Sequence, residues 1–306
     1  AVGLGVAALG LCCAHVLLSM SGPILLDWVK WHHGGRYAFS IPALTFNAYA
    51  FAALLGSSWT IACEPRGVQM LNRPDMLWRF CLVACLFTSG DILSFTSMQH
   101  LDAGTHSLVG KALAIVATVG LSRLVLHKRQ SYAEYGLAAA VAASTFAFCQ
   151  QETQARSALT LGLVGVGDEW WSLGLAQRTL AVFLTSSGAV LQELLLTREP
   201  GLPFMVQQAW MGCGAMTASF LSFSFLQGQP VSRLYHGFDD WRVAVLLILY
   251  VSHGLSAGLM VKRLGAVSKA LAVPVALGGC YAYAVLSGSA AFAYGAVAAW
   301  ADCVAL

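Results

Sequence analysis

The stretch Val109–Ala117 reads VGKALAIVA, and the stretch Val267–Val275 reads VSKALAVPV. Each copy opens a long apolar segment and places a lysine, Lys111 or Lys269, near the start of that segment. A cation inside an apolar segment costs about 2.5–3.5 kcal/mol or more, so both lysines are candidate functional residues. Two copies about half a chain apart predict an internally duplicated membrane transporter.

The composition is that of a membrane protein. The chain is 58% hydrophobic and 10% charged, whereas a soluble domain averages about 25% charged residues. The net charge of +3 and the lack of a basic block argue against nucleic acid as a partner. The nine cysteines form no CxxC pair and no Cys/His metal spacing, so we expect small core residues and neither a metal nor a cofactor. The chain begins with Ala1, so we expect that residues precede it in the full protein.

A membrane-spanning helix needs about 20 mostly apolar residues. The sequence predicts ten such spans, at roughly 2–26, 38–61, 77–99, 104–126, 132–150, 174–196, 203–226, 241–262, 265–286 and 288–306. The polar connection from Gln151 to Trp171 separates five spans from five. Two halves with an odd number of spans cross the bilayer in opposite directions, as inverted repeats do. We therefore expect one all-α transmembrane domain over 1–306, with repeat halves of roughly 1–150 and 174–306.

Basic residues in the short loops set the expected orientation. Nine of them flank the side that carries the even-to-odd loops, and six, Arg178 among them, flank the other side. The bias predicts that both termini are cytosolic.

The two repeated lysines are the first candidate ligands. On one interpretation, Lys111 and Lys269 converge on an anionic ligand near the midplane; on the other, each side chain extends to water at a helix end. Asp91 in the third span is costly unless it is paired or hydrated, so it either contacts a ligand or makes a structural hydrogen bond between helices. Thr105 and His106 lie six and five residues before Lys111 and would line the same cavity.

Polar residues at the ends of two further spans are consistent with either ligand binding or a structural role. Gln207, Gln208 and Trp210 open the seventh span, where they would bind a base or a sugar or hold helices together. Glu193 closes the sixth span, and we expect it to reach water at the interface. The sequence contains no HExxH or Walker motif and no GxSxG between a strand and a helix, so we expect neither catalytic residues nor an enzyme.

The segment from Leu101 to Gln150 resembles the nucleotide-sugar transporters of the Golgi. It contains LDAGT at 101–105, a lysine-bearing segment and the basic loop LHKR at 126–129. The likeness is to the CMP-sialic acid, UDP-galactose and UDP-N-acetylglucosamine branch of the drug/metabolite transporter superfamily, which carries a pattern like LDAATYQxxYQLK. Lys111 falls on the lysine of that pattern after a two-residue deletion, which the internal repeat favours.

The second half resembles the same family without a gap. Gly254-Leu255, Lys262 and Lys269 match GLYTSVVVKY…NIMKG, and Gln208 matches the glutamine of RNIQ. The sequence departs from the family at Asp91, which replaces an amide of paired asparagines, and at 205–206, where Met-Val replaces Arg-Asn.

The resemblance implies an antiporter of the drug/metabolite transporter fold. It would exchange a pyrimidine nucleotide-sugar for the nucleoside monophosphate across the Golgi membrane, with the endoplasmic reticulum as the alternative location. By the same resemblance, Lys111 and Lys269 would hold the phosphates, while Asp91, Gln208 and Trp210 would contact base or sugar. The sequence leaves a homodimer open. It also leaves open a carrier of phosphorylated sugars or organic acids, and a scaffold that keeps the fold without transport.

Overall fold

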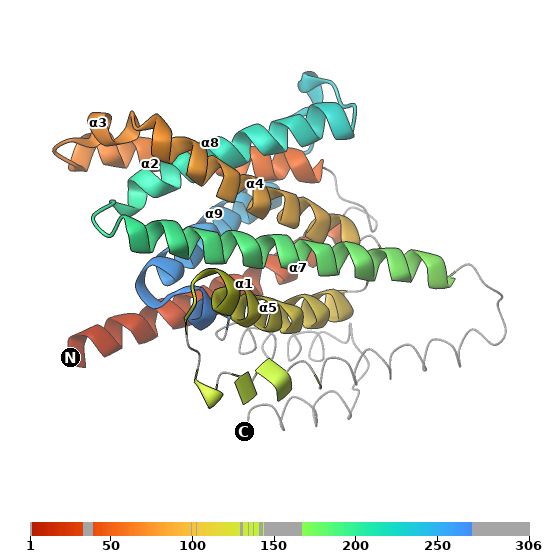
Figure 1. Cartoon of the computed structure of the whole chain (residues 1–306). Coiled ribbons are helices and arrows are strands. Elements are labelled where there is room, and N and C mark those ends of the chain that lie inside the picture. Colours follow the sequence, from red (N-terminus) through yellow and green to blue (C-terminus); the bar gives the residue numbers. More distant parts are fainter. Residues whose placement is uncertain are drawn as a thin grey trace.

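The chain folds into long helices joined by turns, and no strand occurs among the residues that the structure describes (Figure 1). The structure is a computed structural model that describes residues 2–32, 39–98, 100–101, 103–128, short pieces of 131–143, and 167–270. The α-helices are α1 (Val2–His32), α2 (Ile41–Cys63), α3 (Gly67–Leu71), α4 (Pro74–Ser97), α5 (Ala103–Val125), α7 (Gly167–Arg198), α8 (Phe204–Leu221) and α9 (Trp241–Leu264). A π-helical turn (Ser222–Leu226) continues α8, a 3-10 turn (Val231–Arg233) precedes α9, and residues 266–270 are helical.

Four of the described helices are long and apolar enough to cross a membrane. They are α4 and α9 over their whole length, α1 over Leu9–Leu26, and α7 over Ser172–Arg198. The described part of the chain is therefore all-α and has the helices of a membrane protein, as the composition predicts.

Seven of the ten predicted spans coincide with described helices, namely α1, α2, α4, α5, α7, α8 and α9. The predicted spans at 132–150 and 288–306 and the part of 265–286 beyond residue 270 lie outside the described residues, apart from fragments before 144. One boundary was wrong: α7 begins at Gly167, so Asp168 and Glu169 belong to its first turn instead of the connection. Acidic residues are in general favourable in the first turn of a helix, because the N-terminal end of the helix dipole is positive.

Helices α2 and α8 pack closely through small residues, and they lie side by side in Figure 1. A Cβ added to Gly212 would lie 2.7 Å from the backbone N of Ala53. A Cβ added to Gly56 would lie 2.8 Å from the backbone N of Ala209. The two contacts are reciprocal, because each helix presents an Ala-x-x-Gly pair and each alanine meets the glycine of the other helix. Such pairs let two helix backbones approach closely.

The remaining helices surround this pair: α4 packs on α7 and α8, α5 packs on α7, and α1 packs on α9. One end of the bundle is filled by an apolar cluster, which we call the sealed end. Its residues are Met76, Phe80, Leu196, Leu202, Val206, Trp210 and Val261. They come from the starts of α4 and α8, the ends of α7 and α9, and the turn between α7 and α8.

Candidate functional site

A cavity of about 380 Å³ lies between the helices, and α1, α2, α4, α5, α7, α8 and α9 all contribute to its lining. The lining starts near the middle of the bundle and continues toward the end where α1 and α4 finish and α2 and α5 begin. None of the apolar residues of the sealed end lines it. The cavity is thus closed at one end of the bundle by packed side chains.

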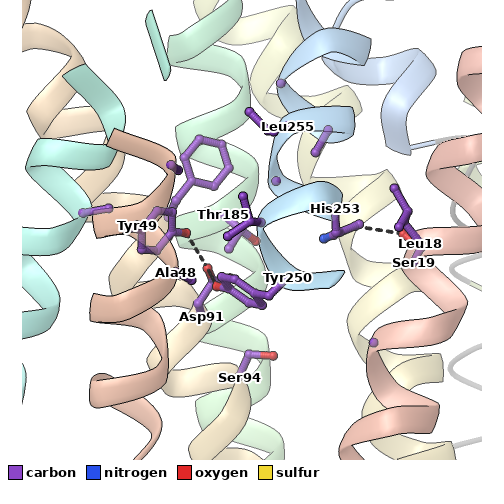
Figure 2. Close-up of a pocket in the computed structure, with 18 of the residues that line it drawn as sticks. Leu18, Ser19, Ala48, Tyr49, Asp91, Ser94, Thr185, Tyr250, His253 and Leu255 are labelled. Atoms are coloured by element: carbon purple, nitrogen blue, oxygen red, sulfur yellow. Dashed lines mark hydrogen bonds between the residues drawn. The ribbon is translucent and has the colours of Figure 1, made fainter. Parts of the chain in front are cut away.

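Asp91 on α4 is held in this cavity by two tyrosines from other helices. The hydroxyl of Tyr49 on α2 donates to Oδ2 of Asp91 at 2.9 Å, and the hydroxyl of Tyr250 on α9 donates to the same oxygen. Both rings point toward the carboxylate in Figure 2, and they meet edge to face with their centroids 6.0 Å apart. The two hydrogen bonds offset part of the free-energy cost of burying a carboxylate among apolar helices. Within the described structure, Oδ1 accepts no hydrogen bond, so it remains available to a ligand.

Arg178 on α7 enters the same cavity beside α5. Its Nε donates to the backbone O of His106 at 3.1 Å, and its Nη1 donates to the hydroxyl of Ser94. Gly110 makes room for the guanidinium, since a Cβ at Gly110 would lie 1.7 Å from Nη2. No carboxylate among the described residues forms an ion pair with Arg178.

Lys269 brings a second cation into the cavity from the helical turn at 266–270. Its Nζ lies 5.4 Å from the ring centroid of Phe87, a cation–π distance. Within the described residues it too forms no ion pair. Gln208 on α8 lines the cavity next to Gly258, where a Cβ would lie 2.6 Å from Nε2 of the glutamine.

Glu193 on α7 anchors the turn that carries Lys269. Its Oε2 accepts the backbone N–H of Ala266 at 2.8 Å, and its Oε1 pairs with the half-exposed Lys128. Glu193 is only 4% exposed, so the expectation that it reaches water at the interface was wrong. The physical reason is that an unpaired N–H at a helix start and a nearby ammonium group together replace the hydration of the carboxylate.

Two histidines stack in the cavity wall where α1 meets α9. The rings of His15 and His253 are nearly parallel, at 11°, with their centroids 5.0 Å apart. Nδ1 of His15 lies 3.0 Å from the hydroxyl of Ser256, and Nε2 of His253 lies 3.0 Å from the hydroxyl of Ser19. Figure 2 shows His253 reaching across to Ser19 on α1. The four side chains therefore tie α1 to α9 by two reciprocal hydrogen bonds.

The structure brings three of the six predicted ligand residues together, because Asp91, Gln208 and Lys269 line one cavity. Trp210 is not among the lining residues. It is 2% exposed, packs on Phe80 and donates its indole N–H to the backbone O of Leu71 at 3.1 Å.

The other two predicted ligand residues, Lys111 and Thr105, lie on α5, but their side chains are outside the described part of the structure. Their neighbours His106, Gly110 and Ala114, spaced one turn apart, are the described α5 residues that line the cavity.

Sequence reasoning missed several lining residues. The distribution of basic residues predicts that Arg178 flanks the membrane, but it lies within the predicted sixth span and the structure places it in the cavity. His15 and His253 each lie inside a predicted apolar span, and a polar ring at such a position was the signal that would have singled them out.

No family model and no curated protein matches this sequence. Fifteen chains of solved structures are similar to it. One of them, described only as the crystal structure of a protein, has a TM-score of 0.58 and 16% identity over 95% of each chain. At this identity the likeness shows the fold alone. The fold is shared along nearly the whole length of both chains.

Proposed function

We propose that this protein is a membrane carrier that binds an anionic, phosphate-bearing solute in the central cavity. The observation that carries the proposal is the pair of cations, Arg178 and Lys269, which line the cavity and form no ion pair with a described carboxylate. Two such cations are costly in an apolar bundle, and an anionic ligand would supply the missing partner. The carboxylate of Asp91 attracts both cations electrostatically, but within the described residues it forms an ion pair with neither.

The favoured ligand is a pyrimidine nucleotide-sugar, exchanged for its monophosphate across the Golgi membrane. Support comes from the resemblance of the segments around Lys111 and Lys269 to the transporters of this class. The cavity volume of about 380 Å³ falls within the usual range for small-molecule sites. Oδ1 of Asp91, which accepts no hydrogen bond from a described residue, and the amide of Gln208 supply acceptors and donors for hydroxyl groups.

The packing of the helices supports ten spans in two inverted repeats. In such a repeat, a two-fold axis would exchange α1 with α7, α2 with α8, and α4 with α9. The contact between α4 and α7 would then correspond to the contact between α9 and α1, and both contacts are extensive. The axis would also exchange the two Ala-x-x-Gly contacts between α2 and α8. The offset between the halves is 156 residues for the alanines (209 − 53) and 158 for the repeated lysines (269 − 111). Ala112 and Ala270, which follow those lysines, belong to one apolar cluster.

A second candidate is a carrier of a smaller phosphorylated sugar or organic acid. The observation in its favour is Trp210, whose indole packs in the sealed end instead of facing the cavity, where it would stack on a base. Such a substrate would need the two cations but no aromatic platform.

Uptake into proteoliposomes tests both candidates. The vesicles would be preloaded with CMP, UMP, GMP or nothing, and the labelled panel would hold CMP-sialic acid, UDP-galactose, UDP-N-acetylglucosamine, GDP-mannose and a triose phosphate. Uptake of one nucleotide-sugar that rises only with its own monophosphate inside is the expected result. Uptake of the triose phosphate alone would favour the second candidate. Flat signals from folded protein would overturn both and leave a scaffold.

A further inference from the structure

The stacked histidines of α1 and α9 lie in the wall of the proposed ligand cavity, yet neither is needed to explain the binding of an anion. Both His15 and His253 line the cavity together with the hydroxyl of Ser19. Their rings face each other at 5.0 Å. Histidine is the side chain whose ordinary titration falls nearest to neutral pH, so the pair is suited to exchange a proton with solvent in the cavity.

The hydrogen bonds identify the nitrogen that would accept a proton. The hydroxyl of Ser256 donates to the backbone O of His253 at 2.8 Å, so toward Nδ1 of His15 it acts as an acceptor. Nδ1 of His15 therefore carries hydrogen, and Nε2 is its basic nitrogen. A serine hydroxyl can donate or accept, so the bond between Ser19 and His253 can form with either protonation state of that ring.

The geometry limits the pair to a single proton. Two imidazolium rings stacked 5.0 Å apart would place like charges face to face in an apolar setting, which strongly opposes the second protonation. A proton from the cavity adds to one ring nitrogen, and no other bond needs to break. The pair thus changes by one positive charge.

That charge would respond to the ligand. Among the described residues, the other titratable or charged side chains that line the cavity are Tyr49, Asp91, His106, Arg178, Tyr250 and Lys269, and Cys12 precedes His15 by one turn outside the lining. The two cations disfavour a further positive charge while the cavity is empty, and the carboxylate of Asp91 offsets only part of this effect. An anionic ligand reverses the balance, and by reciprocity a proton on the pair raises the affinity for the anion.

We infer that His15 and His253 form a one-proton site that loads together with the anionic ligand and makes the carrier proton-coupled. The inference rests on the proposed function, because it takes the cavity to bind an anion. It predicts that ligand affinity falls as the pH rises through neutrality. A coupling of ordinary size would weaken binding roughly tenfold between about pH 6 and about pH 8.

Calorimetry of the purified protein with UDP-galactose and CMP-sialic acid tests the inference, because the phosphates of these ligands do not titrate near neutrality. Titrations in two buffers of different ionisation enthalpy count the protons taken up on binding. The wild type should take up about half a proton per ligand near neutral pH, which is the most that a tenfold coupling allows. His15→Gln combined with His253→Gln should take up none and lose the pH dependence. The exposed His236→Gln is the matched control and should behave as wild type.

Other outcomes overturn the inference. Binding without proton uptake by the wild type does so. The inference is also overturned if Asp91→Asn abolishes proton uptake while the double histidine variant still takes up the proton, because the proton then binds to the carboxylate of Asp91. If neither ligand binds, the proposed function fails separately, and ¹⁵N spectra of the two rings decide. One proton shared between the rings supports the site, whereas two neutral rings down to about pH 5 contradict it.

Discussion

The reciprocal contact between α2 and α8 makes a quantitative prediction for Gly212→Ala. The new Cβ would lie 2.7–2.8 Å from the backbone and Cβ of Ala53, about 1 Å inside the separation at which carbon atoms attract. The two backbones must move apart, and overpacking of this kind costs about 1–3 kcal/mol. Alanine returns up to about 1 kcal/mol in helix propensity. With the full return, the net loss is up to about 2 kcal/mol, or up to about 8 °C in the unfolding midpoint.

The two-fold relation adds a sharper requirement. Gly56→Ala places its Cβ 2.8 Å from the backbone of Ala209, so it should lower the midpoint by a similar amount. The double variant should lose less than the two single losses together, because one separation of the helices relieves both contacts.

Thermal unfolding in detergent, followed by size-exclusion chromatography, measures these shifts. Gly120→Ala on α5 is the matched control, since nothing lies within 4 Å of its added Cβ and its midpoint should stay or rise slightly. A normal midpoint for Gly212→Ala beside a lowered one for Gly56→Ala would refute the reciprocal packing.

Three further predictions concern the cavity and its supports. Lys269→Ala should raise the half-saturating ligand concentration roughly 10- to 150-fold, because it removes a charge-assisted hydrogen bond worth about 1.5–3 kcal/mol. Lys262 lies outside the cavity lining, so Lys262→Ala should leave this concentration unchanged. Equal effects of the two substitutions would contradict the role of Lys269. Asp91→Asn keeps an oxygen that can accept from the two tyrosine hydroxyls. Asp91→Ala leaves both hydroxyls without this acceptor, at a cost of about 1–3 kcal/mol each. Only the alanine variant should therefore lower the unfolding midpoint clearly. Glu193→Gln keeps an acceptor for the N–H of Ala266, so it should reduce the maximal uptake rate less than Glu193→Ala; the same loss in both would contradict the capping role.

The positions of the helices could be predicted because about 20 apolar residues are needed to cross a bilayer, and such runs stand out in this sequence. The three predicted residues found in the cavity lining share one property. Asp91, Gln208 and Lys269 are strongly polar groups inside apolar segments, where their cost makes them conspicuous.

The other features of the site depend on contacts between distant parts of the chain, which no local sequence pattern predicts. Arg178 lies near the start of its span, where the sequence does not distinguish a charge that flanks the membrane from a residue that lines the cavity. Its side chain enters the cavity because Gly110, which has no side chain, leaves space for the guanidinium. Trp210 was open to two interpretations, and the carbonyl of Leu71 at the end of the unpredicted helix α3 gives its indole a partner away from the cavity. His15 and His253 lie more than two hundred residues apart, so only the packing of α1 on α9 brings the rings together.

The sealed end also has a thermal consequence. A carrier that opens this end must hydrate apolar faces such as those of Phe80 and Trp210, which are buried together there. Hydration of apolar surface raises the heat capacity, so the balance between the two facing states should curve with temperature. The exchange rate should then depart from a straight Arrhenius line. Because apolar burial weakens on cooling, a cold membrane would hold a larger share of the carrier with this end open.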